Sequence, residues 1–166
     1  MVGALGDVIL VVRRADVAEI FPLRHAVLRP GRSATDSVYA GDDTAIHIGA
    51  WDGDALVGCA TTFADPWAGS PPDDTGEWTV VPAAPTAWRL RGMAVEPGRQ
   101  GQGIGAQVLA EIVRTARDQG APLLWANARS AALSFYLRAG WIVAGPEFLT
   151  KDTGLPHRAM TVGLAP

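Results

Sequence analysis

The chain has 166 residues, 48% of them hydrophobic, and a formal net charge of −3, which together predict a single globular domain over residues 1–166. The acidic balance and the lack of a Lys/Arg-rich run argue against nucleic-acid binding, and no apolar run approaches the roughly 18 residues that would cross a membrane. The single cysteine, Cys59, excludes an internal disulfide and a cysteine-rich zinc site. We therefore expect a cytoplasmic protein without a metal, and leave a homodimer open as one oligomeric state.

The first half of the chain predicts a strand, a helix and a β-hairpin. Residues 8–14 are rich in β-branched side chains, and Asp16 offers an N-cap for a helix over 17–29. The pair Asp52-Gly53 lies between two β-rich runs, which is a strong hairpin signal. Those two runs cover residues 44–51 and 55–64.

A proline-rich loop and then alternating strands and helices make up the second half. Residues 65–87 carry five prolines and predict a long loop with one short strand at 77–81. Gly92 lies inside the next strand and indicates a bulge or a close backbone approach. The expected elements are strands over 88–95, 122–128, 141–145 and 156–164 and helices over 104–119 and 131–139. We expect the strand over 122–128 to be buried on both faces, because its apolar residues do not alternate.

A glycine-rich stretch joins the strand over 88–95 to the helix that begins at residue 104. Its glycines are Gly98, Gly101, Gly103 and Gly105. A turn of this kind exposes backbone N–H groups at a helix N-terminus, which favours a phosphate-bearing ligand. An ATP or GTP loop would need a Lys-Ser/Thr pair, and this stretch has neither residue.

The stretch also matches the dinucleotide fingerprint, because Gly101, Gly103 and Ala106 fit the spacing G-x-G-x-x-G/A. That fingerprint is normally followed, about 20 positions on, by an acidic residue that ends the next strand. The corresponding strand here carries Asn127 instead. A pyrophosphate without nicotinamide, as in coenzyme A, is therefore favoured over NAD.

Two blocks of the sequence resemble the GCN5-related N-acetyltransferase (GNAT) superfamily. The stretch RGMAVEPGRQGQGIGAQVL is similar to its signature motif, Gln/Arg-x-x-Gly-x-Gly/Ala, and LLWANARSAALSFYLRAGW is similar to its second half. The blocks span about residues 88–145, which would be the CoA-binding half. The resemblance implies an α/β (α+β by some schemes) three-layer fold with a central mixed sheet of six or seven strands, helices on both faces and a splayed strand at the CoA site.

The resemblance also implies roles for individual residues. The backbone of Met93, Ala94 and Val95 would pair with the pantetheine arm, and the Val95 amide would donate to the thioester oxyanion. Tyr136 corresponds to the general acid near the CoA sulfur, and Asn127 to a pantetheine contact. On pattern alone, Tyr136 is better explained as a packed aromatic, and the resemblance reverses that preference in favour of a catalytic or cofactor contact. Asn127 is equally explained as a turn cap. The residues expected around the pyrophosphate are Arg99, Gln100, Gly101, Gln102, Gly103, Ile104, Gly105 and Ala106.

The general base and the acceptor site are less defined. The strand over 88–95 carries no carboxylate, so Glu77 in the proline-rich loop and Glu96 remain as alternatives for the base. His47, Glu147 and His157 are further candidates for the acceptor side, each with a plain alternative as a solvated or structural residue. Charges of the first helix are either contacts for an anionic acceptor or exposed surface charges: Arg24, His25 and Arg29.

The expected function is transfer of an acetyl group from acetyl-CoA to a primary amine of a small molecule or peptide, by direct attack in a ternary complex. Acetyl-CoA is the expected co-substrate, with no metal, nucleic acid or membrane as a partner. The missing carboxylate keeps an alternative open, a non-catalytic acyl-CoA sensor or interaction module.

Overall fold

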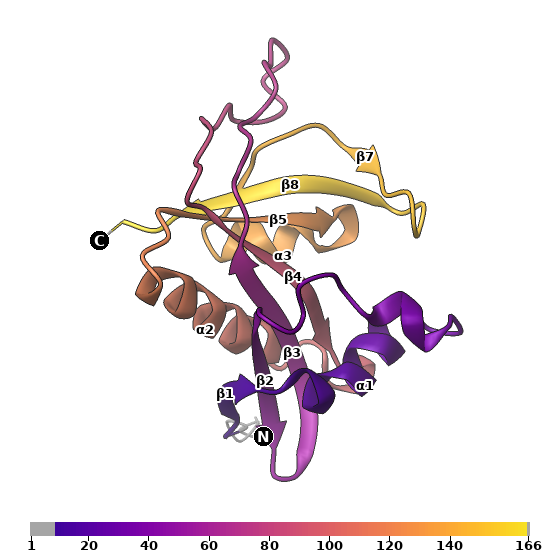
Figure 1. Ribbon diagram of the computed structural model, residues 1–166. Helices are drawn as coiled ribbons and strands as arrows, with labels where there is room; N and C mark the ends of the chain where they lie inside the picture. Colours follow the sequence, from indigo (N-terminus) through magenta and orange to yellow (C-terminus); the bar gives the residue numbers. More distant parts are fainter. Residues whose placement is uncertain (1–8, 166) are drawn as a thin grey trace, which may run out of the picture. The chain divides into compact units, whose positions relative to one another are not determined.

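The computed structural model describes residues 9–165. Three α-helices and eight strands form within this part of the chain, together with three short 3-10 helices labelled η (Figure 1). In chain order they are β1 (Val11–Ala15), α1 (Val17–Leu28), η1 (Ala34–Ser37), β2 (Ile46–Asp52), β3 (Ala55–Ala64), β4 (Trp88–Val95), η2 (Pro97–Arg99), α2 (Ile104–Asp118), β5 (Leu123–Arg129), η3 (Ser130–Ala132), α3 (Leu133–Arg138), β6 (Ile142–Val143), β7 (Phe148–Leu149) and β8 (Pro156–Gly163).

The strands pair in the order β1-β2-β3-β4-β5-β8-β6, and β7 pairs with β8. The β4–β5 pair is parallel, whereas β1–β2, β5–β8, β6–β8 and β7–β8 are antiparallel. The expected mixed sheet is therefore confirmed. It has eight strands. The strand expected over 141–145 corresponds to β6, and the additional strand, β7, contains two residues and is too short to leave a sequence pattern.

The chain folds as two compact units, each built from two separate stretches. Unit 1 runs to Thr61 and resumes at Gly92–Ile112, and unit 2 comprises Thr62–Arg91 and the chain from Val113 onward. The single domain expected over residues 1–166 stays a prediction.

In unit 1, helices cover both faces of β3. A Cβ placed on Gly58 would lie 2.8 Å from Cγ2 of Ile104 in α2. The next residue, Cys59, packs with Ile20 of α1. Successive residues of a strand face opposite sides of the sheet, so α2 lies on one side of β3 and α1 on the other. The expected placement of helices on both faces is confirmed here.

The entry to α1 follows the sequence pattern closely. Asp16 is the N-cap, and its backbone N–H donates to Oε2 of Glu19 over 2.8 Å. Glu19 in turn accepts from Arg13 at 3.1 Å. The carboxylate in the first turn also favours the helix electrostatically, because it lies at the positive end of the helix dipole.

Unit 2 contains the antiparallel pair of β5 with β8, whose register runs from Leu123↔Gly163 to Arg129↔His157 (Figure 1). Burial alternates along β5, with Leu124, Ala126 and Ala128 buried and the residues between them half-buried. The expectation that this strand is buried on both faces is wrong, because the face that carries Trp125 is only partly covered.

The proline-rich segment 65–87 covers part of that second face. Trp67 forms an isolated bridge with Ala84 and packs against Trp125, with the two ring centroids 5.5 Å apart. The Trp125 indole donates to the Asp65 carbonyl over 2.9 Å. The segment forms no strand over 77–81, so the short strand expected there is absent from the described chain.

Within residues 9–165, none of the helices is long and apolar enough to cross a bilayer.

Candidate functional site

The glycine-rich loop between β4 and α2 has a backbone that only glycine adopts readily. Gly101 and Gly103 have φ angles of 80° and 78°. A Cβ added to either would meet no atom within 4 Å. Glycine is therefore required here for the left-handed backbone conformation and not for lack of space.

The loop leads directly into the N-terminus of α2. Ile104 is buried, which fixes the first turn against β3, and the Gln107 N–H donates to the Gly103 carbonyl over 3.2 Å. The N–H groups of Ile104, Gly105 and Ala106 precede that bond, so the helix itself offers them no acceptor. With the helix dipole, they form a local positive end suited to an anion.

Arg99 ties this loop to the β2–β3 turn. Its Nη2 donates to Oδ2 of Asp52 over 2.8 Å and its Nε donates to Oε1 of Gln102 over 2.9 Å. The Arg99 side chain is 23% exposed, so part of its surface lies in solvent. It therefore both orders the loop and adds a positive charge to it.

The strand that leads into the loop carries the backbone irregularity expected from Gly92. Gly92 has a φ of 66°, and its carbonyl lies 3.8 Å from the Cys59 thiol, which donates to it. Ala94 is buried against Cys59. The parallel pairing of β4 with β5 covers two residue pairs, Trp88↔Leu124 and Arg89↔Trp125, which agrees with a strand that pairs only over its first part.

A buried polar cluster beside Gly92 was missed by the sequence analysis. Arg24 is fully buried and forms a two-pronged ion pair with Asp42, at 2.7 Å from Nη1 and 3.2 Å from Nη2. It also donates to the Ser37 carbonyl and to Oγ1 of Thr61, and its guanidinium lies 4.3 Å from the centroid of the Tyr39 ring. We call these five residues, with His47, the Arg24 cluster.

The charges in the cluster are balanced. Burial opposes ionisation of the Asp42 carboxyl, but hydrogen bonds from Arg24 and from the Tyr39 amide, together with the Arg24 charge, outweigh it and hold the pKa of Asp42 below its usual value of 3.8. Arg24 was considered as an exposed helix charge or an acceptor contact, and the structure excludes exposure. The neighbouring His25 bonds Oγ of Ser37 at 2.7 Å.

His47 is part of this cluster and has both ring nitrogens in hydrogen bonds. Its Nε2 lies 2.8 Å from the Asp42 carbonyl, which can only accept, so Nε2 carries the proton. In the neutral ring, Nδ1 then accepts from the Thr61 hydroxyl, also at 2.8 Å. His47 is 5% exposed, so its alternative as a residue of the solvent face is wrong.

Tyr136 and Asn127 both belong to unit 2. Tyr136 is buried in α3, and its ring meets Trp141 edge-on with centroids 5.2 Å apart. Burial raises the pKa of its hydroxyl above the usual value of 10. Asn127 is half-buried in β5, opposite Ala159 of β8. Tyr136 is therefore a packed core aromatic, as the alternative to a catalytic role requires, and its expected role in catalysis stays a prediction.

The candidates for the acceptor side separate into two groups. Glu77, Glu147 and His157 lie in unit 2, with Glu77 exposed in the proline-rich segment, whereas His47 lies in unit 1. Glu147 accepts from the Ser130 hydroxyl over 2.8 Å. His157 pairs with Arg129 across β5–β8.

The His157 ring has a defined protonation pattern when it is neutral. Nδ1 lies 2.8 Å from the Leu155 carbonyl and therefore carries the proton, which leaves the lone pair on Nε2. The Phe148 ring packs on it with centroids 6.0 Å apart.

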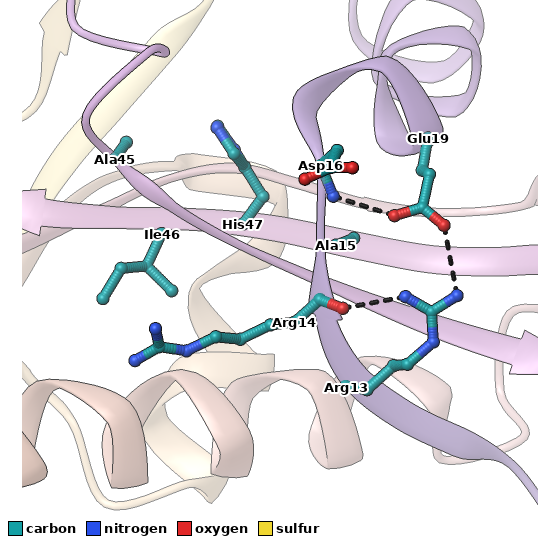
Figure 2. A pocket seen from close by; sticks show the side chains of 8 residues that line it. All are labelled: Arg13, Arg14, Ala15, Asp16, Glu19, Ala45, Ile46 and His47. Atoms are coloured by element: carbon teal, nitrogen blue, oxygen red, sulfur yellow. Dashed lines mark hydrogen bonds and ion pairs between the residues drawn. The ribbon is translucent and has the colours of Figure 1, made fainter.

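An open cavity of about 350 Å³ lies in unit 1 where β1 meets α1 (Figure 2). Figure 2 shows Arg13 turned toward Glu19, with the Arg14 guanidinium directed the other way. Of the predicted site residues, this cavity contains His47 alone. Elsewhere in residues 9–165, no group of three or more His, Cys, Asp or Glu side chains is arranged to hold a metal ion.

Comparison with known proteins agrees with these features. Residues 16–141 match the Acetyltransferase (GNAT) family. The chain is 26% identical over 141 residues to the uncharacterized N-acetyltransferase YitI of Bacillus subtilis (strain 168), across 84% of this chain and 87% of YitI. A candidate N-acetyltransferase from Lactobacillus plantarum has a similar structure, with a TM-score of 0.71 at 18% identity over 94% of this chain and 99% of that one. Salmonella typhimurium yncA, solved with its cofactor acetyl-CoA, gives a TM-score of 0.64 at 19% identity over 95% of both chains.

The chain therefore belongs to the GNAT acetyltransferase family. The family was identified correctly from the two sequence blocks, and the mixed sheet with helices on both faces is the fold expected from them.

Proposed function

We propose that this protein is an N-acetyltransferase that moves an acetyl group from acetyl-CoA to a primary amine of a small molecule or peptide. The observation that carries the proposal is the left-handed backbone at Gly101 and Gly103, which presents free amides at the start of α2. Membership of the acetyltransferase family and the acetyl-CoA bound to Salmonella yncA support it.

The loop would hold the pyrophosphate of CoA. The anion would accept from the amides of residues 100–106, and the adjacent Arg99 would contribute charge without leaving Asp52. Side chains at Gly101 or Gly103 would stand between the backbone and the anion, so the glycines serve binding as well as turning.

The backbone of Met93, Ala94 and Val95 would pair with the pantetheine arm as an added strand does. The Val95 amide would then donate to the thioester carbonyl, whose oxygen gains negative charge when the amine attacks. The buried Ala94 side chain supports this arrangement, because it anchors the middle of the segment on the α1 side.

The reaction would be a direct attack. The amine nitrogen forms a bond to the acetyl carbon, the carbon–sulfur bond breaks, and the CoA thiolate takes a proton from the Tyr136 hydroxyl. That hydroxyl is protonated at neutral pH, as an acid requires, while burial raises its pKa and so makes it a weaker donor than an exposed tyrosine. Asn127 would contact the pantetheine. The excess proton on the acetylated nitrogen passes to a base. The base then returns a proton through solvent to the Tyr136 oxygen.

Among the acceptor-side candidates, His157 is best suited to take that proton, because its Nε2 lone pair is left available by the bond from Nδ1 to Leu155. Glu147 would attract the amine in its protonated form, which loses one proton to solvent before its lone pair attacks the thioester. His47 has no free ring nitrogen, and Glu77 lies exposed in the proline-rich segment, so both are weaker candidates.

A second function has one observation in its favour. No residue of β4 is a carboxylate, so a base on this strand is missing, and the protein would then bind acyl-CoA as a sensor or interaction module. A cytoplasmic location and the oligomeric state stay predictions from the sequence.

Thermal unfolding with acetyl-CoA, CoA or NAD tests the binding step. Acetyl-CoA and CoA should raise the melting temperature, because a ligand that binds only the folded state stabilises it by mass action, whereas NAD should not. The absence of a shift with both CoA ligands would contradict the proposal. Thiol release from acetyl-CoA over a broad panel of amines then separates an enzyme from a sensor, which would release no thiol beyond slow hydrolysis.

A further inference from the structure

The Arg24 cluster lies directly against the strand that the proposed function assigns to acetyl-CoA. A Cβ placed on Gly92 would be 3.2 Å from Cε2 of Tyr39 and 3.3 Å from Nε of Arg24. The aromatic ring and the edge of the guanidinium therefore close one side of β4 at the position where its backbone turns left-handed.

The cluster is an unusual way to fill this space. A buried ion pair is costly to desolvate, and apolar side chains of similar volume often stabilise a core as well. Among the described residues, the buried Nε of Arg24 also has no hydrogen-bond partner. Packing alone therefore does not explain why a fully buried arginine, whose Nε–H group makes no hydrogen bond, lies beside Gly92.

The position of the Arg24 guanidinium is better explained by a role in fixing the geometry of β4 at Gly92. The flat guanidinium is held from two sides, by the Asp42 carboxylate and by the Thr61 hydroxyl, and it stacks under the Tyr39 ring. Its position is therefore set by α1, by the segment after η1 and by β3 together. The contact of Tyr39 and Arg24 with Gly92 selects the backbone conformation of Gly92. That conformation sets the direction in which the backbone of Met93 to Val95 runs.

We propose that Arg24 is a positioning residue. It holds Tyr39 against Gly92 and thereby aims the backbone of Met93 to Val95 at the acetyl thioester. The inference rests on the proposed function, since it concerns the same strand. The inference goes further than the proposed function in one respect. It assigns recognition of the acetyl group, as distinct from the rest of CoA, to the Arg24 cluster, which would act through the backbone of β4 and not by direct contact.

The test compares dissociation constants for acetyl-CoA and for CoA, measured by titration calorimetry on the whole chain. Arg24→Met and Tyr39→Leu should weaken acetyl-CoA binding about five- to tenfold, the worth of one hydrogen bond, and change CoA binding by less than about twofold. Arg24→Lys should resemble Arg24→Met, because an ammonium cannot reproduce the planar fork. Arg32→Met, which removes an arginine from an exposed pair with Asp36, is the control and should change neither.

The inference would be overturned if the Arg24 and Tyr39 variants bound acetyl-CoA and CoA more weakly by the same factor, or if they bound both as tightly as the wild type. If Arg24→Met does not fold, Tyr39→Leu decides the matter, because it leaves the Arg24–Asp42 pair in place. A wild-type chain that binds neither ligand would instead contradict the proposed function, so the two failures are distinguishable.

Discussion

Nη2 of Arg99 lies 2.8 Å from Oδ2 of Asp52, and this ion pair joins the glycine-rich loop to the turn between β2 and β3. The pair partly neutralises the one cationic side chain within that loop, so the charge that a bound anion meets depends on a carboxylate 47 positions earlier. Both side chains keep contact with solvent, so the pair contributes little to folding, about 0–1 kcal/mol.

Replacing Asp52 with asparagine should therefore strengthen CoA binding. Loss of the carboxylate leaves the loop more positive, and we expect about two- to fivefold tighter binding at low salt that disappears near about 1 M salt. Titration calorimetry at both salt concentrations checks this. Asp118→Asn, which breaks the exposed Arg114–Asp118 pair, is the matched control and should leave affinity unchanged. Weaker CoA binding by Asp52→Asn would contradict this prediction. It would mean that the Arg99–Asp52 pair contributes more to CoA binding by ordering the loop than it costs by neutralising Arg99.

Alanine at Gly101 should destabilise the loop by its backbone strain alone. The left-handed conformation costs an L-residue about 1–2 kcal/mol, and the open space around the added methyl brings no clash to that cost. Chemical denaturation should show this loss, and acetyl-CoA affinity should fall with it. Gly98→Ala serves as the control, because Gly98 lacks a positive φ and is equally open, so its stability should be unchanged or slightly raised. Equal effects at the two positions would contradict a conformational origin.

Tyr136→Phe should lower kcat by about a hundredfold or more while the KM for acetyl-CoA stays near its wild-type value. The change removes the proton donor and keeps the ring that packs on Trp141, so the fold should be retained. Steady-state kinetics with any amine acceptor found in the panel measures both constants. A kcat that does not change would leave Tyr136 as a packed aromatic.

The same hydroxyl predicts the behaviour of the protein in alkaline solution. Its pKa is raised in the folded state, so the folded chain holds the proton more tightly than the unfolded chain does. This contribution to stability is complete below the ordinary pKa of 10 and is lost as the pH rises above it. Denaturant titrations from neutral pH to beyond pH 10 should show the free energy of unfolding fall less steeply for Tyr136→Phe than for the wild type. Parallel curves would contradict a buried, protonated tyrosine.

Cys59 should be unreactive in the folded protein. Burial raises the pKa of its thiol to about 12, so thiolate is scarce at neutral pH and reagents cannot reach it. A thiol-labelling reagent should modify Cys59 only in denaturant, and Cys59→Ala should keep acetyl-transfer activity. Loss of turnover with the fold intact would indicate an acetyl-cysteine intermediate in place of direct attack.

The features that the sequence predicted well are those encoded over short distances. The glycine-rich turn before α2, the hairpin at Gly53 and the special backbone at Gly92 depend on one or two residues, because only glycine freely adopts the positive φ angles found there. The family match rested on two contiguous blocks, which is why it agreed with the family found for residues 16–141.

The buried cluster escaped prediction because its partners are distant in the chain. Arg24 meets Asp42 and Thr61 from 18 and 37 positions away, and nothing in a helix of mixed charges distinguishes an arginine that faces inward. The two-sided burial expected for β5 failed for a related reason. Trp125 has the apolar character of a core residue but is only half-buried under the proline-rich segment, whose path no local pattern reveals.

Gly58 sets the distance between β3 and the N-terminus of α2. The absence of a side chain there lets Ile104, the first residue of α2, settle onto β3, since a single methyl would come within 2.8 Å of it. A larger residue at this position would clash with Ile104 and push the N-terminus of α2 away from β3. If the start of α2 binds the pyrophosphate as proposed, the distance of that site from the sheet is set by Gly58 in the core, and substitution there would change CoA affinity without altering one residue of the loop.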